Sequence, residues 1–189
     1  MIGHAGFADP IRDSQVCFRA VLDAMARPGQ VHVIAAAMDP PPGLDPATAA
    51  VLLTLADADT PLWLDAAATG ARDWAAFHCG APPAAPEAAA LALALGPLRL
   101  TGFATGTDDA PEQGATLILQ VAAMGRGAAL MLSGPGLAEP AGLLIEGLPD
   151  GFVADWAANR ALFPRGVDVI LCAGDRVAAL PRTVALQVA

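Results

Sequence analysis

The sequence predicts an α/β fold, in which helices cover both faces of a mixed β-sheet to give three layers. Helix-like and strand-like segments alternate along most of the 189 residues, which favours this class over all-helical or all-strand folds. At least two pairs of strand-like segments are separated by short glycine-containing turns, which is typical of antiparallel hairpins. The proline-rich stretches are only of loop length, so we expect residues 1–189 to form a single domain.

The first predicted element is a helix that ends near Arg27. Asp9-Pro10 provides its N-cap and first-turn proline, and Pro28-Gly29 provides the stop. Several apolar side chains fall within one quadrant of this helix, and we expect them to form its buried stripe: Ile11, Phe18, Val21, Leu22 and Met25. A different face carries the charged side chains Arg12, Arg19, Asp23 and Arg27.

The next elements follow from caps, prolines and alternation. The β-branched, alternating stretch Gln30–Ala36 predicts a strand, and Asp45-Pro46 repeats the capping device at the start of a helix to Ala56. A short strand at Leu62–Leu64 and a helix at Ala71–Cys79 come next. Alternating leucines in Ala88–Leu95 favour a strand there, although alanine and leucine also suit a helix.

The second half of the chain consists mainly of predicted strands. Ala115–Ala122 and Ala128–Ser133 are apolar enough to be buried, and the glycines of Gly125-Arg126-Gly127 between them predict an antiparallel hairpin. Pro149–Leu162 has helical spacing, with Trp156 toward the core. The remaining predicted strands are Val167–Cys172, Arg176–Leu180 and an edge strand at Thr183–Val188.

The charged residues exclude several classes of enzyme. All ten basic residues are arginine, and 19 acidic residues bring the net charge to −9. Schiff-base enzymes, P-loop NTPases and kinases with a strand lysine all need the lysine that this chain lacks. The acidic balance argues against nucleic-acid binding, which needs a basic surface. Any bound anion is therefore held by arginine, backbone N–H groups or a metal.

The sequence predicts no membrane span, cofactor or metal centre. The apolar fraction is 55%, but 45 residues are alanine, and the apolar runs fall short of the roughly 20 residues that cross a bilayer. The N-terminus lacks the pattern of a signal peptide, so we expect a cytoplasmic protein. Cys17, Cys79 and Cys172 are widely spaced, with no CxxC pair, and are expected to be structural.

Two polar loops contain candidate binding residues. Asp57 and Asp59, beside Thr60, have the oxygen ligands that Mg²⁺ prefers, or they form only helix-end and turn hydrogen bonds. The second loop precedes a buried strand, where backbone N–H groups are presented at a rigid edge. Its candidate residues are Thr105, Thr107 and Glu112.

Four arginines at the ends or on the charged face of predicted elements are candidate anion ligands: Arg19, Arg27, Arg165 and Arg182. A guanidinium group pairs with phosphate oxygens through two parallel hydrogen bonds. The alternative is a solvated role, since Asp23 lies four residues from both Arg19 and Arg27 and suits helical ion pairs. No nucleophile–base pattern accompanies these residues, so no catalytic residue is assigned.

Five motifs together resemble the PhnH family, a subunit of the bacterial carbon–phosphorus lyase machinery. The motifs are DSQVCFRAVLDAMARPG (Asp13–Gly29), VLLTLADADTPLWL (Val51–Leu64), GATLILQVA (Gly114–Ala122), LSGPGL (Leu132–Leu137) and LFPRGVDVILCAGDRVAALPRT (Leu162–Thr183). They follow in order over nearly the whole chain, and their combination is specific although each alone is weak. The alanine-rich segments 66–68 and 84–94 depart from the family pattern and lie outside the motifs.

The resemblance implies much more than the residue spacing does. Members of the family act in the cytoplasm, form homodimers and join the other core subunits in phosphonate utilisation. With those subunits they support attack of methylphosphonate on the ribose of ATP, which yields α-D-ribose 1-methylphosphonate 5-triphosphate. The implied fold is similar to that of pyridoxal-phosphate-dependent transferases, without the cofactor.

Three hypotheses for the function follow. In the first, the chain is a subunit of the complex without catalysis of its own. In the second, it is an independent transferase that uses the loop carboxylates and arginines. In the third, it is a regulatory module that binds a nucleotide or phosphonate such as ATP or methylphosphonate.

Overall fold

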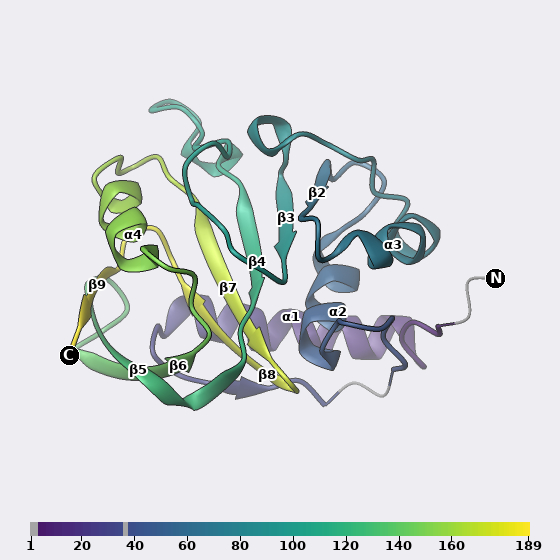
Figure 1. Ribbon diagram of the computed structural model, residues 1–189, viewed down its shortest axis with the longest axis horizontal. Helices are drawn as coiled ribbons and strands as arrows, with labels where there is room; N and C mark the ends of the chain where they lie inside the picture. Colours follow the sequence, from purple (N-terminus) through teal and green to yellow (C-terminus); the bar gives the residue numbers. More distant parts are fainter. Residues whose placement is uncertain (1–3, 36–37) are drawn as a thin grey trace.

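The centre of the molecule is a mixed sheet. The computed structural model describes residues 4–35 and 38–189, and within these residues six strands form the sheet in the order β1-β8-β7-β4-β3-β2 (Figure 1). The strands are β1 (His32–Val33), β2 (Leu62–Leu64), β3 (Leu91–Ala94), β4 (Thr116–Gln120), β7 (Asp168–Ala173) and β8 (Arg176–Leu180). The neighbours from β2 to β7 run parallel, whereas β8 is antiparallel to β7 and β1. The sheet is therefore mixed, as predicted.

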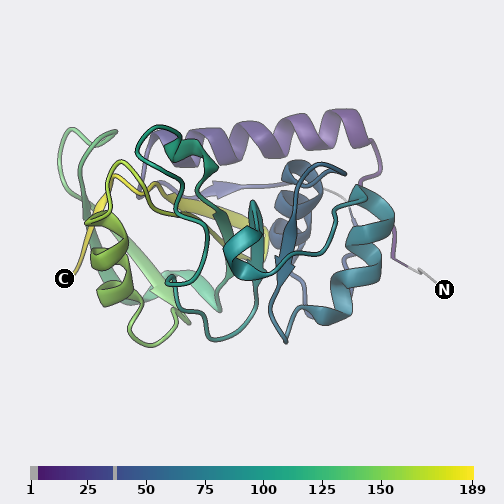
Figure 2. The same ribbon diagram turned by 90° about the horizontal axis from the view of Figure 1, so that it is seen from above.

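Helices cover both faces of this sheet, and a second sheet joins them on one face. The helices α1 (Pro10–Ala26), α2 (Pro46–Leu55) and α3 (Arg72–Cys79) pack on one face, and α4 (Phe152–Arg160) lies on the other. Figure 2 shows α1 and α4 on opposite sides of the strands. Beside α4 lies an antiparallel sheet in the order β6-β5-β9, made of β5 (Ala123–Ser133), β6 (Ala141–Glu146) and β9 (Ala185–Val188).

The central sheet separates two hydrophobic clusters. Side chains alternate between the faces of a strand, so on β4 Ile118 enters the cluster beneath the helices α1 to α3, while Leu117 and Leu119 enter the other. Trp156 of α4 is fully buried in that second cluster, and its indole N–H donates to the backbone oxygen of Val184 at 2.8 Å. This arrangement fixes α4 against the end of the chain.

The predicted helices α1 and α3 begin and end where the sequence indicates. The Asp9 carboxylate caps α1 by accepting the Arg12 N–H at 3.1 Å, and Pro10 is its first residue. Helix α3 ends at Gly80, whose φ of +68° is a conformation that glycine adopts without strain. Helix α4 is shorter than the predicted 149–162, while the strand predicted in 88–95 is confirmed as β3. The strand predicted at 30–36 is reduced to β1, and residue 36 lies outside the described residues.

The predicted hairpin between 115–122 and 128–133 is wrong. Strand β4 pairs with β3 and β7 in the central sheet, whereas β5 belongs to the small sheet and pairs with β6 and β9. The Gly125-Arg126-Gly127 segment lies inside β5, as an irregularity in the register against β6 between Met124 and Ala128. Glycines at positive φ suit a bulge as well as a turn, and β6 itself was missed by the sequence.

The predicted buried stripe of α1 is largely wrong. Ile11, Phe18 and Leu22 have exposed fractions of 74%, 49% and 56%. Val21 is buried as predicted, and Met25 is partly buried against the cluster beneath the helices. The face that packs against the molecule carries the small side chains of Cys17 and Ala24 beside Val21. Periodicity shows that one helix face is apolar, but it does not show that the same chain covers this face.

Candidate functional site

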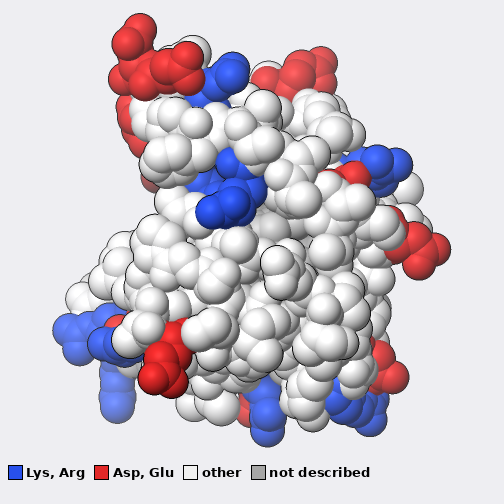
Figure 3. Space-filling view, turned by 90° about the vertical axis from the view of Figure 1, so that its left-hand side faces the viewer, with Lys and Arg blue, Asp and Glu red and all other residues white. Residues whose placement is uncertain are grey.

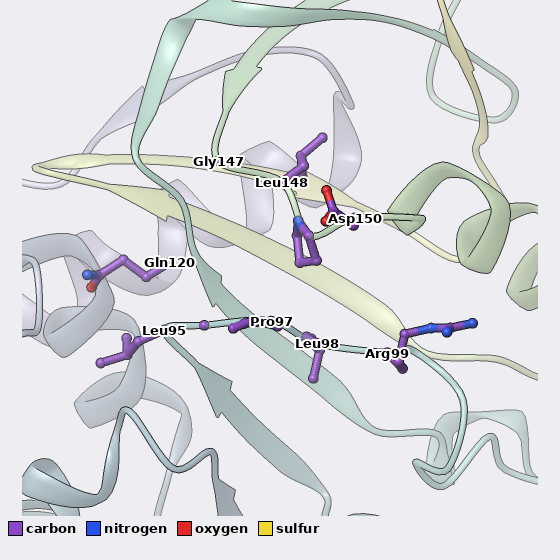
Figure 4. Close-up of a pocket in the computed structure, with 10 residues that line it drawn as sticks. Leu95, Pro97, Leu98, Arg99, Gln120, Gly147, Leu148 and Asp150 are labelled. Carbon is purple, nitrogen blue, oxygen red and sulfur yellow. The ribbon is translucent and has the colours of Figure 1, made fainter.

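A pocket of about 440 Å³ lies at the carboxyl ends of β3 and β4. Its walls are the segments 95–99, directly after β3, and 147–150, directly after β6 (Figure 4). Gln120, the last residue of β4, also lines the pocket. Open α/β sheets bind their ligands beyond the carboxyl ends of the parallel strands, so this position is the expected one for a binding site.

The lining of this pocket is mostly apolar, with a few polar groups. Pro97 and Leu98 come from the first wall, and Leu148 and Pro149 come from the second. In Figure 4 Arg99 stands at one end of the row of lining residues, and its side chain points beyond that end, away from Gln120. Apolar walls with a few fixed polar groups are common in small-molecule sites.

Arg99 is held in place by a buried carboxylate of α4. Its Nε donates to Asp155 Oδ2 at 2.7 Å and its Nη2 donates to Asp155 Oδ1 at 2.8 Å. Asp155 is 7% exposed and also accepts the Leu100 N–H at 3.2 Å, whereas the Arg99 side chain is 70% exposed. The hydrogen bond from Arg99 holds the pKa of Asp155 below its usual value, and the same bond raises the pKa of Arg99. The pair therefore fixes the guanidinium group of Arg99, which stands at one end of the pocket lining.

Asp65 fixes the backbone at the start of the first wall. This buried carboxylate follows β2 and accepts the N–H groups of Leu95 and Gly96, both at 2.9 Å. It also accepts the Ala68 N–H at 2.6 Å. Three backbone donors satisfy this carboxylate, so its role is to hold the chain where β3 leaves the sheet.

Both polar atoms of the Gln120 side chain form hydrogen bonds with the loop that precedes α2. Its Oε1 accepts the Asp45 N–H at 2.8 Å, and its Nε2 donates to the Gly43 oxygen at 2.9 Å. The Asp45 carboxylate in turn accepts the Gly174 N–H at 2.7 Å. These contacts close one end of the carboxyl edge and leave Arg99 as the basic side chain that lines the pocket.

Most of the residues predicted as binding candidates lie at the opposite, amino edge of the parallel strands. Asp57 precedes β2 and accepts a hydrogen bond from the Thr60 hydroxyl at 2.6 Å and another from the Asp59 N–H at 2.9 Å. The bond from Thr60 is the main reason why the pKa of this exposed carboxyl is lowered. These hydrogen bonds within the turn correspond to the second of the two alternatives for Asp57 and Asp59, local turn hydrogen bonds, which stood beside a Mg²⁺ site.

The loop with Thr105, Thr107 and Glu112 precedes β4 at the same edge. The Thr107 hydroxyl accepts the Ala110 N–H at 3.0 Å, and the Thr105 oxygen accepts the Gly166 N–H at 2.8 Å. Glu112 is exposed in a single 3₁₀ turn, Pro111–Gln113. This loop is thus connected to the segment that enters β7.

Arg182 is the residue that holds the amino edge together. Its side chain is 13% exposed and pairs with the Asp168 side chain, which is 14% exposed. Nε and Nη2 of Arg182 both donate to Asp168 Oδ2, at 3.1 Å and 2.5 Å. Its Nη1 donates to the Pro111 oxygen. Arg165 lies at the same edge, 3.1 Å from the exposed carboxylate of Asp108.

Arg19 of α1 and Arg27, the residue that caps its C-terminal end, lie apart from both edges. Arg27 pairs with Asp23 at 3.1 Å, in the helical i,i+4 spacing that the sequence suggested. Arg19 is exposed beside Phe18 in a shallow groove along α1. The four predicted arginines therefore do not converge on one pocket, and none of them lines the pocket at the carboxyl edge.

The buried cysteines are held as thiols. Burial raises the pKa of Cys17 to about 11, and burial also raises the pKa of Cys172. Both side chains are fully buried in the cluster beneath the helices, where cysteine packs as a small apolar residue. Within residues 4–35 and 38–189, no group of three or more His, Cys, Asp or Glu side chains is placed to hold a metal ion.

Sequence reasoning missed Asp65, Arg99 and Asp155. A signal existed for Asp65, because it directly follows the strand predicted at Leu62–Leu64, and polar residues after parallel strands mark the edge where ligands bind. No comparable signal existed for Arg99, whose partner Asp155 is 56 residues away in the sequence.

Comparison with known proteins identifies the family. The family model described as bacterial phosphonate metabolism protein (PhnH) matches residues 5–187 of this chain. The chain belongs to the PhnH family. A PhnH-family relative from Rhizobium meliloti (strain 1021), "Alpha-D-ribose 1-methylphosphonate 5-triphosphate synthase subunit PhnH", is 41% identical over 187 residues, which cover 96% of this chain and 94% of the relative.

A second relative has the name "Putative C-P lyase subunit protein HtxG" and comes from Stutzerimonas stutzeri. It is 35% identical to this PhnH-family chain over 170 residues, or 89% of this chain and 83% of the relative. The predicted resemblance to the PhnH family is thus confirmed. Among the described residues of this PhnH-family member, no helix has the length and apolar character needed to cross a membrane.

Proposed function

We propose that this chain is the PhnH subunit of an α-D-ribose 1-methylphosphonate 5-triphosphate synthase and acts with the other carbon–phosphorus lyase subunits in the cytoplasm. The single observation that carries the proposal is the 41% identity to the subunit from Rhizobium meliloti over 94% of that protein's length. The chain acts as one α/β domain in this proposal. Its role is to present a surface and a ligand pocket, while partner subunits carry out the bond-forming chemistry.

A supporting role fits the way in which the polar side chains are used. At the amino edge, Arg182 is hydrogen-bonded to Asp168. At the carboxyl edge, the side chains of Asp65 and Gln120 are hydrogen-bonded to backbone groups. Figure 3 shows that, on the face at the left-hand side of Figure 1, the charged side chains gather in separate small groups between wide uncharged areas. A surface of this kind is suited to contact with other proteins.

We infer that the exposed apolar face of α1, formed by Ile11, Phe18 and Leu22, contacts a second copy of the chain in a homodimer. These side chains are 74%, 49% and 56% exposed, and large apolar side chains that share one helix face lose unfavourable contact with water when another chain covers them. A twofold axis beside α1 brings the same face of two copies together, as isologous interfaces require.

Co-purification tests the subunit role. The full chain, co-expressed with the remaining subunits, is expected to elute with them in one complex. A chain that never associates with those subunits overturns the proposal. Turnover of ATP and methylphosphonate by the isolated chain would instead support the independent transferase.

Light scattering after size exclusion tests the homodimer. The wild-type chain is expected at twice the monomer mass of 19.0 kDa, and Phe18→Glu is expected to shift it toward the monomer. Phe163→Glu is the control, because Phe163 is 63% exposed but lies outside α1. A wild-type monomer, or an equal shift with both variants, contradicts this interface.

A further inference from the structure

We propose that the pocket between segments 95–99 and 147–150 binds an organic anion whose phosphorus-bound oxygens are held by Arg99, with Asp155 as the positioning residue. This inference rests on the proposed function and deepens it by naming the ligand class, a phosphate or phosphonate. It adds a site at the carboxyl edge, where the sequence placed no candidate residue.

The first argument is the free side of the Arg99 guanidinium group. Asp155 takes the Nε–H and one hydrogen of Nη2. Arginine has five N–H donors in a planar fork, so Nη1 and the second hydrogen of Nη2 remain available to a ligand. The side chain is 70% exposed, and such a fork matches two oxygens of a tetrahedral phosphorus group.

The second argument is that the guanidinium group is held in one orientation before any ligand binds. An unrestrained exposed arginine loses side-chain entropy when it binds an anion. Here the side chain has already lost much of that freedom, because both oxygens of Asp155 hold it and α4 holds Asp155. The Leu100 N–H also donates to Oδ2 of this carboxylate and helps to hold it in place. Asp155 therefore acts through Arg99 and does not touch the ligand.

The third argument is the chemistry of the rest of the pocket. Asp150 in the second wall accepts hydrogen bonds from ligand hydroxyl groups and repels a second anionic group, so the phosphorus group belongs at the Arg99 end. Pro97, Leu98 and Leu148 offer apolar contact to the organic part. A volume of about 440 Å³ lies within the usual range of roughly 300–1,000 Å³ for ligand pockets.

Arg99 also neutralises the buried Asp155, and a purely structural salt bridge would look the same in the protein alone. The two roles predict different losses on substitution. A structural role predicts that Arg99→Ala lowers stability and leaves ligand affinity unchanged in the fraction that folds. The proposed role predicts a loss of affinity in folded protein.

Titration calorimetry on the full chain separates these outcomes. The probes are ATP, methylphosphonate and inorganic phosphate, with adenosine as the probe that lacks phosphorus. We expect saturable binding of at least one phosphorus probe and none of adenosine at the same concentration. Binding of ATP alone identifies a nucleotide, preferential binding of methylphosphonate identifies a phosphonate, and equal binding of all three identifies the phosphorus oxyanion alone as the determinant.

Three variants locate the site. Arg99→Ala is expected to raise Kd about tenfold or more, because a charge-assisted hydrogen bond is lost, and Arg99→Lys is expected to recover part of the affinity. Arg27→Ala is the matched control, since Arg27 is an exposed arginine with one carboxylate partner on a helix away from the pocket. Its Kd is expected to equal that of the wild type.

Asp155→Asn tests the positioning role through the effect of Arg99. In the wild-type background it is expected to raise Kd severalfold, whereas in the Arg99→Ala background it is expected to change Kd no further. A structural role of Asp155 would lower affinity equally in both backgrounds. Thermal unfolding of each variant verifies that the titrated protein is folded.

The inference is overturned if no phosphorus probe binds the wild-type chain at millimolar concentration, or if Arg99→Ala and Arg27→Ala lose affinity equally. Co-purification of Arg99→Ala with the other subunits keeps this result separate from the proposed function. An assembled complex with no ligand affinity in the wild-type chain rejects the pocket and leaves the subunit role standing. A chain that binds ATP but never joins the complex rejects the subunit role and leaves the ligand pocket standing.

Discussion

The two edges of the parallel strands differ in how tightly they are filled. At the amino edge, Arg182 and Asp168 are both almost buried, and a Cβ atom on Gly114 would lie 2.3 Å from the Gly166 oxygen. At the carboxyl edge a pocket of about 440 Å³ is open, and a Cβ on Gly96 would lie 3.5 Å from the Asp65 carboxylate, an ordinary contact. The segments around Gly114 at the amino edge are therefore in close contact, whereas a cavity lies between segments 95–99 and 147–150 at the carboxyl edge.

This difference shows that the density of polar residues in the sequence does not locate a binding site. The amino edge carries most of the predicted candidates, yet Asp57, Arg165 and Arg182 there already contact other groups of the same edge. The carboxyl edge carries fewer charges, and one guanidinium group there keeps free donors next to a cavity. Unsatisfied donors beside a cavity are a better indication of binding than the number of charged residues.

The largest expected effect concerns the closed edge. Arg182→Ala removes the partner of the Asp168 carboxylate, which is nearly buried. The free energy of unfolding is therefore expected to fall by about 3 kcal/mol. Urea unfolding measures this loss. Arg27→Ala, which removes an exposed helical ion pair, is the control and is expected to cost about 0.5 kcal/mol at most. Equal losses would mean that the amino edge is no more tightly held than the surface.

The next largest effect on stability is expected from substituting one glycine at each edge. Gly114→Ala places a methyl group against the backbone oxygen of Gly166, which must move, so a loss of about 1–3 kcal/mol is expected. Gly96→Ala meets only ordinary contacts and is expected to change stability by less than about 0.5 kcal/mol. Both values come from the same unfolding experiment. Similar losses for the two variants would contradict the contrast between a closed and an open edge.

The fold was largely predictable from the sequence because its signals are local. Asp9-Pro10 and Gly80 mark helix ends through their own backbone preferences, and alternation identified the strand in 88–95. The partner of a strand is not a local property. Strand β4 looked like half of a hairpin because Gly125 and Gly127 follow it closely, and its parallel neighbours β3 and β7 are distant in the sequence.

The candidate site was less predictable for the same reason. Once β4 was assigned to a hairpin, its carboxyl end was no longer recognisable as the edge where ligands bind. The pairing of Arg99 with Asp155 depends on α4 packing beside the segment after β3, and no spacing of residues encodes that contact. The exposed stripe of α1 shows the converse case, because its local pattern was clear, but no part of residues 4–35 and 38–189 covers that face.

A smaller effect concerns Asp65, which holds the first wall of the pocket. Asp65→Asn replaces an acceptor of three backbone N–H groups with an amide that can present only one oxygen to them, so a loss of about 1–2 kcal/mol in unfolding free energy is expected. Hydrogen exchange is expected to speed up at Leu95 and Gly96 in particular. Unchanged protection at these two amides would mean that the wall is fixed by other contacts.

The smallest effect is the pH dependence of Asp155. The hydrogen bond from Arg99 lowers the pKa of Asp155 in the folded state, so its ionised form stabilises the fold above the unfolded pKa of about 3.9. This contribution is lost as the pH falls through the lower, folded-state pKa. The stability difference between wild type and Asp155→Asn is therefore expected to be constant near neutral pH and to shrink below about pH 4. Unfolding at a series of pH values measures it, and a difference that does not change with pH contradicts the pairing.

The most direct test of the contrast between the two edges is to map backbone amide shifts by NMR during titration of the full chain with ATP and, separately, methylphosphonate. The open carboxyl edge predicts that the largest shifts occur in segments 95–99 and 147–150. Segments 105–114 and 165–168 at the closed amino edge are expected to remain unchanged. Shifts concentrated in those amino-edge segments, with none around Arg99, would contradict the assignment of the ligand pocket to the carboxyl edge.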